Sequence, residues 1–362
     1  MQTSQTVQTI MAPLLRAATG WLPPHRPRGR MRSAERAAGV IVMAALMVQA
    51  TTLVVPFAAP VDGVGANKAG PGAPGDSAVG VRDAFFGPYM GYPWHDRSDG
   101  HLIRPGGTDL VIKDMRWDAE PFNFPLYAGV RYVRWDGRFG GMIDFLHDKA
   151  IPRTGRGAHG RRLKNGGERA VPDQVYTEGL YKGQPLPQPT DINNIFERLE
   201  FTHGHNMLLP TALVRLGSLT PKLRPYIGFG IGAALPHVEM WEKDEPMVSR
   251  TNEYQSAGGA WQIVAGLEWQ LDRGSVYAEY KYTWAKIDAN LTGGKTPWWC
   301  NCDFVSDSIR HISAWMKGER AKYGSFSTTM TAHQVVAGAG YRPGSGPLPY
   351  QDKIPFLKKS AP

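Results

Sequence analysis

The sequence predicts an all-β protein, an eight-stranded antiparallel transmembrane β-barrel with long loops on one rim and an N-terminal signal segment. Three observations favour this fold. Short segments of alternating apolar and polar residues recur along the chain, and the connections between them alternate between short and long. After the N-terminal region, no apolar run approaches the ~20 residues that a membrane helix requires. Weakly apolar, alternating segments of this kind are typical of membrane barrels.

Eight segments have the length and the alternation expected of membrane strands. In the segment 275–288, Tyr280 lies on one face while Glu279 and Lys281 lie on the other, because successive side chains of a strand point to opposite faces. The apolar face can meet lipid, so we expect side chains of mixed charge to pair in a crowded interior, namely Arg131, Asp144, Arg215, Glu268, Glu279 and Lys281. The predicted strands are 79–92, 126–135, 138–148, 203–216, 224–240, 259–271, 275–288 and 328–341.

The connections are of two kinds. Three are short: Asp136-Gly137, which is a strong hairpin signal, 217–223 and 272–274. The other four are long, and they cover 93–125, 149–202, 241–258 and 289–327. Short turns at one end and long loops at the other are the arrangement of outer-membrane barrels.

The N-terminal region has the pattern of an export signal. Arginines between residues 28 and 36 precede an apolar stretch at 37–50, and small residues follow up to Ala59. A membrane-anchoring helix is the alternative, although the apolar run is short for a span. We therefore divide the chain into an upstream extension and signal peptide at 1–59, a flexible linker at 60–77, a barrel at 78–342 and a C-terminal tail at 343–362.

The formal net charge of +9 gives little support to a nucleic-acid-binding function. Residues 1–50 hold six of the 41 basic side chains and one of the 32 acidic ones, so 35 basic and 31 acidic side chains remain. A nucleic-acid-binding protein would keep a concentrated basic face. The strongest basic cluster here, which includes Arg153 and Arg161, falls in a Gly-rich loop. It is either a solvated loop or a surface that contacts phosphates.

Histidines and carboxylates gather at the predicted loop-side ends of the strands. His203 and His205 form an H-x-H pair, His237 and Glu239 form an H-x-E pair, and His147 ends another strand. Residues i and i+2 of a strand share a face, so each pair can present two ligands together. Imidazole combined with carboxylate suits Zn, Fe, Cu or Mn. The pattern indicates a metal site, and solvated rim side chains are the alternative interpretation.

Several motifs have a recognisable form. Phe201-Thr202-His203-Gly204-His205-Asn206-Met207 is the most specific. The others include Pro105-Gly106-Gly107-Thr108-Asp109-Leu110, Ile112-Lys113-Asp114, Asp144-Phe145-Leu146-His147-Asp148, Pro236-His237-Val238-Glu239 and Asp288-Ala289-Asn290-Leu291-Thr292. Across roughly residues 79–342, with gaps, these segments resemble the rhizobial lipid A oxidase family.

The resemblance implies an outer-membrane barrel enzyme. Such an enzyme would oxidise the proximal glucosamine of lipid A to 2-aminogluconate, using molecular oxygen and a divalent metal ion and releasing hydrogen peroxide. On the matched motifs we expect metal ligands among His147, His203, His205, His237 and Glu239. We expect catalytic roles for Lys113, Asp114 and Asp148, and substrate contacts at Asp109, Arg153, Arg161, Asn206 and Asp288. The expected partner is lipopolysaccharide, without nucleic acid, and the expected state is a monomer in the outer membrane.

The chain also departs from that family. Two predicted loops carry insertions near 152–190 and 295–326, and a tail follows Tyr341. A different function is therefore also open: a non-enzymatic outer-membrane barrel whose loops bind a partner or lipopolysaccharide. A small-solute pore fits a crowded interior less well.

Overall fold

The computed structural model describes residues 83–163, 167–292 and 322–342, together with residues 307, 311, 313, 316 and 317. All of them belong to the compact unit Ala50–Pro362; the other unit is Met1–Gln49. The predicted signal peptide, linker and tail, and strand residues 79–82, lie outside the described residues. Within the described part of the chain, no helix is long and apolar enough to span a membrane.

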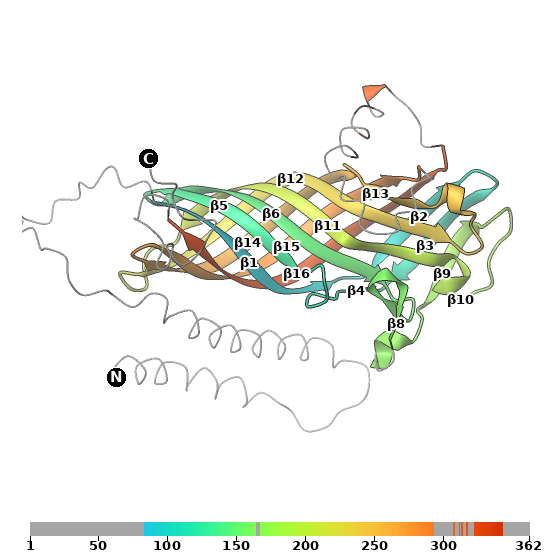
Figure 1. Ribbon diagram of the computed structural model, residues 1–362, viewed down its shortest axis with the longest axis horizontal. Helices are drawn as coiled ribbons and strands as arrows, with labels where there is room; N and C mark the ends of the chain where they lie inside the picture. The colour runs from blue at the N-terminus through green and yellow to red at the C-terminus, as the bar shows by residue number, and fades with distance from the viewer. Residues whose placement is uncertain are drawn as a thin grey trace, which may run out of the picture. The chain divides into compact units, whose positions relative to one another are not determined.

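Eight antiparallel strands pair in cyclic order, because the first strand, β1, pairs with both its neighbour β5 and the last strand, β16. Figure 1 shows these strands running side by side at a common slant. The ring consists of β1 (Asp83–His95), β5 (Ala128–Asp136), β6 (Phe139–Pro152), β11 (Phe196–Arg215), β12 (Leu223–Glu242), β14 (Gly258–Leu271), β15 (Gly274–Asn290) and β16 (Ser325–Tyr341). Every predicted strand overlaps one of these, so the predicted strand order and antiparallel pairing are confirmed.

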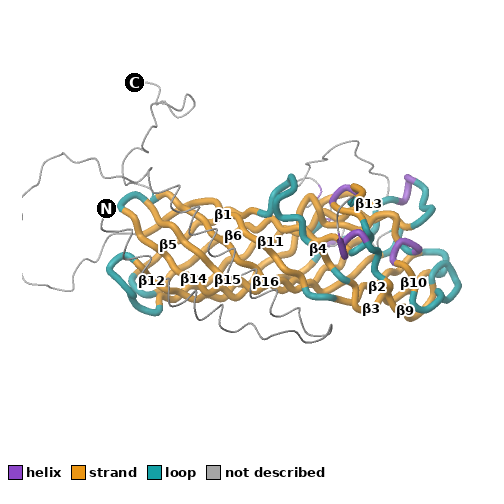
Figure 2. Tube along the Cα trace, turned by 90° about the horizontal axis from the view of Figure 1, so that it is seen from below, coloured by secondary structure: helices purple, strands orange, loops and turns teal. Residues whose placement is uncertain are grey.

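The predicted alternation of connections is also confirmed. The turns after β5, β11 and β14 are short, and the other described connections are long. The long connections are not plain loops, because further short strands form in them. Figure 2 shows β2, β3, β9 and β10 together at one end of the ring. These strands are β2 (Ser98–Arg104), β3 (Thr108–Met115), β4 (Trp117–Asp118), β7 (Arg156–Gly157), β8 (Arg161–Arg162), β9 (Gln174–Leu180), β10 (Thr190–Asp191) and β13 (Thr251–Tyr254).

The sequence pattern explains the best of these extra strands. In β3, Leu110 and Ile112 are fully buried and alternate with more exposed neighbours, which is the period of a half-buried strand. Gly106 and Gly107 both have positive φ, as the tight turn between β2 and β3 requires. The sheet then continues from β16 through β2, β3, β9 and β10. The predicted long loop 93–125 is therefore largely a hairpin attached to the ring.

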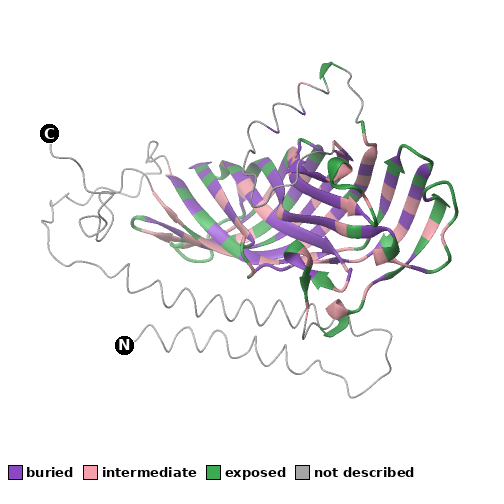
Figure 3. Ribbon diagram, turned by 45° about the vertical axis from the view of Figure 1, so that its right-hand side comes forward, coloured by how far each residue is buried: buried purple, intermediate pink, exposed green. Residues whose placement is uncertain are grey.

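The inner face of the ring is packed. Every ring strand contributes to one buried apolar cluster, and buried and exposed residues alternate along the strands (Figure 3). Charged side chains pair within this interior, as predicted. Arg131 lies 2.7 Å from Glu279, Lys281 contacts Asp144, and Arg215 lies 2.9 Å from Glu268. A second apolar cluster lies where β11, β12, β15 and β16 meet the extra strands.

The outer face of the ring carries large apolar side chains that are exposed. They come from seven of the eight strands: Phe86, Met90, Tyr132, Phe139, Ile143, Leu208, Ile227, Phe229, Ile231, Ile263, Leu267, Trp269 and Tyr280. We refer to these residues as the apolar band. Along each strand they alternate with the buried interior residues, so the two faces differ in chemistry as the sequence predicted.

Candidate metal centre on the outer face of the ring

A bulge in β11 places the first site residue. Between Glu200 and His205 the strand advances five residues while the pairing on β12 advances three, from Glu239 to Pro236. Against β6, β11 advances four residues while its partner advances two. Two extra residues are therefore inserted in β11 at Thr202–Gly204. An insertion of this kind bends the strand and redirects its side chains.

Gly204 makes this bulge possible. Its φ is +126°, a backbone conformation that other residues rarely adopt. A Cβ on Gly204 would lie 2.2 Å from Oδ1 of Asn206. The bulge leaves Phe201 in the buried core and His205 buried, while the side chain of His203 is 20% exposed. The side chains of His203 and His205 are thus separated, although their spacing predicted a shared face.

The redirected His203 meets residues from β12 and from the long connection after β6. His159, in the 3-10 turn Ala158–Gly160, His203 and Glu239 offer one ligand atom each, and these atoms all lie within 4.8 Å of one another. Nδ1 of His203 donates a hydrogen bond of 2.6 Å to Oε1 of Glu239. The His203 ring centroid lies 4.8 Å from those of both His159 and His237. We call His159, His203 and Glu239 the outer cluster, with His237 beside it.

Two buried carboxylates share one arginine beside the outer cluster. Arg198 contacts Glu200 through Nε, and its Nη1 lies 3.2 Å from Oε2 of Glu239. Burial raises the pKa of Glu200 to about 7, with a further contribution from the negative charge of Glu239. Burial alone would also raise the pKa of Glu239. Its contacts with His203, His237 and Arg198 outweigh that effect and hold its pKa well below the ordinary value.

The 3-10 turn Ala158–Gly160, which carries His159, is bonded to one of these two carboxylates. The backbone N–H of His159 donates a hydrogen bond of 2.8 Å to Oε2 of Glu200. Burial lowers the pKa of the His159 imidazole, which favours the neutral, ligating form at neutral pH. His159 itself is exposed, so one side of the outer cluster remains open. Two imidazoles, one carboxylate and an open side suit a transition-metal ion that exchanges ligands.

A buried histidine nitrogen without a hydrogen-bond partner lies next to the outer cluster. Nδ1 of His147 hydrogen-bonds Oδ1 of Asn206 at 2.8 Å, and the Asn206 amide group donates to the Leu235 carbonyl at 3.2 Å. This second bond fixes the amide orientation, so Nδ1 of His147 carries the proton and Nε2 carries the lone pair. Nε2 of His147 is buried without a hydrogen-bond partner among the described residues, whereas Nδ1 of His237 lies 3.5 Å from Oε1 of Glu239. A ring nitrogen with a free lone pair, such as Nε2 of His147, fits a metal-binding environment.

The predicted metal ligands therefore fall into two groups, one on the outer face of the ring and one on the inner face. His203, His237 and Glu239 come together, and His147 lies nearby on the outer face. His205 points to the inner face, where its Cα pairs with that of Asp148. His159 is absent from the predicted set. It sits in the Gly-rich basic loop with positive φ, and no spacing pattern links that loop to the strands.

The predicted residues on β3 and β15 lie elsewhere. Lys113 has acidic partners, Asp99 at 3.3 Å and Glu178 at 3.2 Å. Asp114 contacts Arg97, and Asp109 lies 2.7 Å from His101. Asp288 is exposed on β15. Within the described part of the chain, Lys113, Asp109, Asp114 and Asp288 therefore make no contact with the outer cluster, and Asp148 belongs to the inner face.

The basic loop is neutralised by neighbouring acids. Arg153 makes two hydrogen bonds to Asp118, of 2.8 and 3.2 Å. Arg161 lies 3.1 Å from Glu120, which also binds Arg169 at 3.0 Å. The charges of Arg153 and Arg161 are therefore partly used within the protein, which reduces their value as phosphate contacts.

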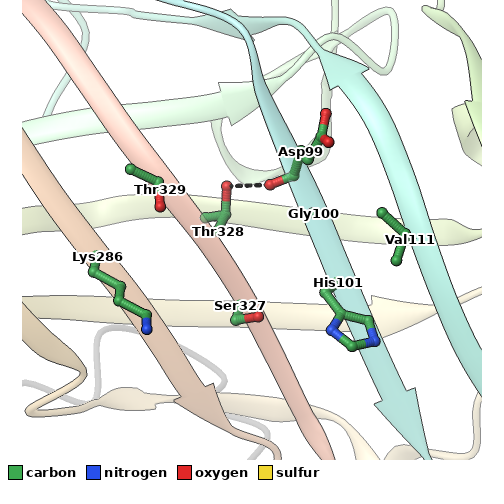
Figure 4. A pocket seen from close by; sticks show the side chains of 8 residues that line it. All are labelled: Asp99, Gly100, His101, Val111, Lys286, Ser327, Thr328 and Thr329. Atoms are coloured by element: carbon green, nitrogen blue, oxygen red, sulfur yellow. Dashed lines mark hydrogen bonds between the residues drawn. The ribbon is translucent and has the colours of Figure 1, made fainter.

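One cavity of about 170 Å³ lies between β2, β3, β15 and β16. Figure 4 shows it lined by Asp99, His101, Lys286 and Thr329 among others, with Thr328 donating to the Asp99 carbonyl at 2.8 Å. None of its lining residues belongs to the outer cluster. The chain as a whole matches no protein-family model and no curated protein sequence.

Proposed function

We propose that this protein is an outer-membrane β-barrel enzyme that oxidises the proximal glucosamine of lipid A, using a divalent metal ion and molecular oxygen. The resemblance of its motifs to the lipid A oxidase family suggests the reaction. The position of the outer cluster on the outer face of the ring, beyond the apolar band, is the observation that carries the proposal.

The apolar band supports a membrane location. Thirteen large apolar side chains would otherwise meet water, whereas a bilayer would bury them. The cyclic pairing leaves the ring without free edges, which is what hydrocarbon surroundings require of a β-structure. Charged side chains of the ring point inward and pair there, as Arg131 does with Glu279 and Lys281 does with Asp144. We take the ring segments that carry the apolar band as the membrane-spanning part.

The outer cluster begins just beyond that part. Asn206, on the outer face, is two residues from Leu208 of the apolar band, and His237 and Glu239 continue the same face of β12. Two residues of a strand advance about 7 Å. A glycolipid whose acyl chains lie against the apolar band would therefore present its sugar at the level of His147, His203 and Glu239. A site on the outer face of the ring, next to the apolar band, suits a lipid substrate better than a soluble one.

The donor set fits the implied metal ion. His159, His203 and Glu239 would hold it, and the proton now shared between His203 and Glu239 would leave when it binds. A divalent ion bound there supplies Lewis-acid and redox chemistry. The reaction moves two electrons and two protons from the anomeric carbon and its hydroxyl to O2, giving hydrogen peroxide, and water opens the lactone to 2-aminogluconate.

The residues of the chain have distinct parts in that reaction. Arg198 holds Glu239 and Glu200 in place, and the turn that carries His159 is held to Glu200 through the His159 backbone N–H. Nε2 of His147 is the best-placed proton acceptor, because Asn206 fixes its tautomer and leaves the lone pair free. It takes the role predicted for Asp114 or Asp148, which lie away from the outer cluster.

The test is lipid A analysis by mass spectrometry after expression in a Gram-negative host that lacks this modification and whose lipid A carries a free anomeric hydroxyl, the group that the reaction oxidises. The wild-type protein should add one oxygen atom to lipid A and produce peroxide. His203→Ala should abolish both, whereas His101→Ala, at a histidine outside the cluster, should retain both. Unmodified lipid A with a folded, metal-loaded wild-type protein would refute the oxidase function. A folded wild-type protein that binds no metal at all would favour the non-enzymatic surface barrel.

A further inference from the structure

A second group of metal-ligating side chains lies on the inner face of the ring. It consists of His95 of β1, Asp148 of β6 and His205 of β11, which are 8%, 0% and 2% exposed. Nδ1 of His95, Oδ2 of Asp148 and Nδ1 of His205 are buried without hydrogen-bond partners among the described residues. We call these three residues the inner triad.

Two members of the inner triad are held by the backbone of one residue. Nε2 of His95 donates to the carbonyl of Lys149 at 2.8 Å, so in the neutral imidazole the other nitrogen, Nδ1, carries the lone pair. Oδ1 of Asp148 accepts the backbone N–H of Lys149 at 2.6 Å, which leaves Oδ2 free. Nε2 of His95 and Oδ1 of Asp148 are 3.6 Å apart. In metal sites, a hydrogen bond on one ligand atom in this way orients the other toward the ion.

The third member is placed by strand pairing. The Cα atoms of His205 and Asp148 are register partners on β11 and β6. Both side chains lie on the inner face, and such cross-strand neighbours have Cβ atoms about 4.5–5.5 Å apart. His205 therefore faces the same enclosed space as Asp148, on the opposite side of β11 from the outer cluster.

The free atoms of the inner triad destabilise the folded protein when no cation is bound. A buried polar atom without a partner is destabilising, because it has lost its hydrogen bonds to water and gained none in the protein. The nearby lysine does not offset the Asp148 charge directly, because Nζ of Lys149 donates to the carbonyl of Asn123 at 2.6 Å. Arg131, another cation of the interior, is paired with Glu279 rather than with Asp148. A cation held between the two imidazoles and the carboxylate would satisfy all three free atoms at once.

We propose that His95, Asp148 and His205 bind a second divalent transition-metal ion inside the ring. Two imidazoles and one carboxylate favour Zn, Fe, Co or Ni over Mg or Ca, which prefer oxygen ligands. The ligand atoms of the outer cluster lie within 4.8 Å of one another, whereas the inner triad is a more open group of ligand atoms. Because its ligands come from three strands, the ion links β1, β6 and β11.

Metal stoichiometry tests this proposal independently of lipid A oxidation. The full chain, folded in detergent micelles, is incubated with Zn²⁺ and desalted, and bound zinc is measured by elemental analysis. His203→Ala, which removes the outer site, should retain one ion per chain. The double variant His203→Ala with Asp148→Asn should retain none. The matched control, His203→Ala with His101→Ala, should still retain one.

Folding is checked in each variant by the heat-dependent gel mobility of the folded ring. His205→Gln replaces Asp148→Asn if the latter does not fold. Zn²⁺ should also raise the melting temperature of His203→Ala and leave that of the double variant unchanged. Folded His203→Ala without zinc, or equal zinc content with and without Asp148→Asn, overturns the inner site, since ordered water then satisfies these atoms. Absence of lipid A oxidation would refute only the proposed function, because the zinc readout does not depend on it.

Discussion

Gly204→Ala tests the bulge that creates the outer cluster. A Cβ at this position would lie 2.2 Å from Oδ1 of Asn206, and φ of +126° is unfavourable for alanine. Forcing a side chain into such a backbone conformation costs about 1–3 kcal/mol. The Asn206 amide must also move, which breaks its bonds to His147 and to the Leu235 carbonyl, each of which contributes about 1 kcal/mol. Together these contributions predict a loss of about 3–5 kcal/mol of stability.

The same change should weaken metal binding, because the bulge directs His203 toward Glu239. We expect zinc affinity at the outer cluster to fall about 10–100-fold, as when a metal ligand loses its supporting contacts. Urea unfolding of the metal-free protein gives the stability, and zinc titration in a variant with Asp148→Asn isolates the outer site. Gly259→Ala is the control, since no atom lies within 4 Å of its Cβ. Wild-type stability and affinity in Gly204→Ala would refute this account of the bulge.

Four further predictions address the charges, the ligand from the loop and the membrane. The pKa of Glu200 is raised to about 7, so its protonated form favours the fold, and stability of the metal-free protein should fall as pH rises from about 4.5 to 7; Glu200→Gln should flatten that dependence in urea unfolding. Arg131→Met should cost about 3–5 kcal/mol because it leaves the buried Glu279 carboxylate without its cation, and adding Glu279→Gln should recover part of the loss in the same assay. His159→Ala should reduce zinc affinity at the outer cluster by at least about tenfold with unfolding unchanged, and equal affinity would remove His159 from the ligand set. Phe229→Arg should cost about 2–4 kcal/mol when the protein is folded in lipid vesicles, whereas a cost under about 0.5 kcal/mol would argue against membrane burial of the apolar band.

The ring strands were predictable because their signal is local. In β15, Tyr280 alternates with Glu279 and Lys281, and this period alone assigns one face to the outside and one to the interior. The Asp136-Gly137 turn and the short connections fixed which strands are hairpin partners. The same alternation predicted that Lys281 and Asp144 both face the interior, where the structure brings them into contact. The extra strands β2, β3 and β9 were missed because their stability comes from pairing with β16, far away in sequence.

The sequence did not predict on which sides of β11 the two histidines of the H-x-H pair lie. His203 and His205 have the spacing of a two-ligand pair, yet the two residues inserted at Thr202–Gly204 put them on opposite sides of β11. A bulge changes registry between strands, and registry is a property of the assembled sheet rather than of one segment. The sequence by itself determined the strands, their antiparallel order and the contrast between an apolar outer face and a charged interior. Only the tertiary structure brought His159 to His203 and Glu239, because their contact depends on how a long connection folds back onto a strand distant in the chain.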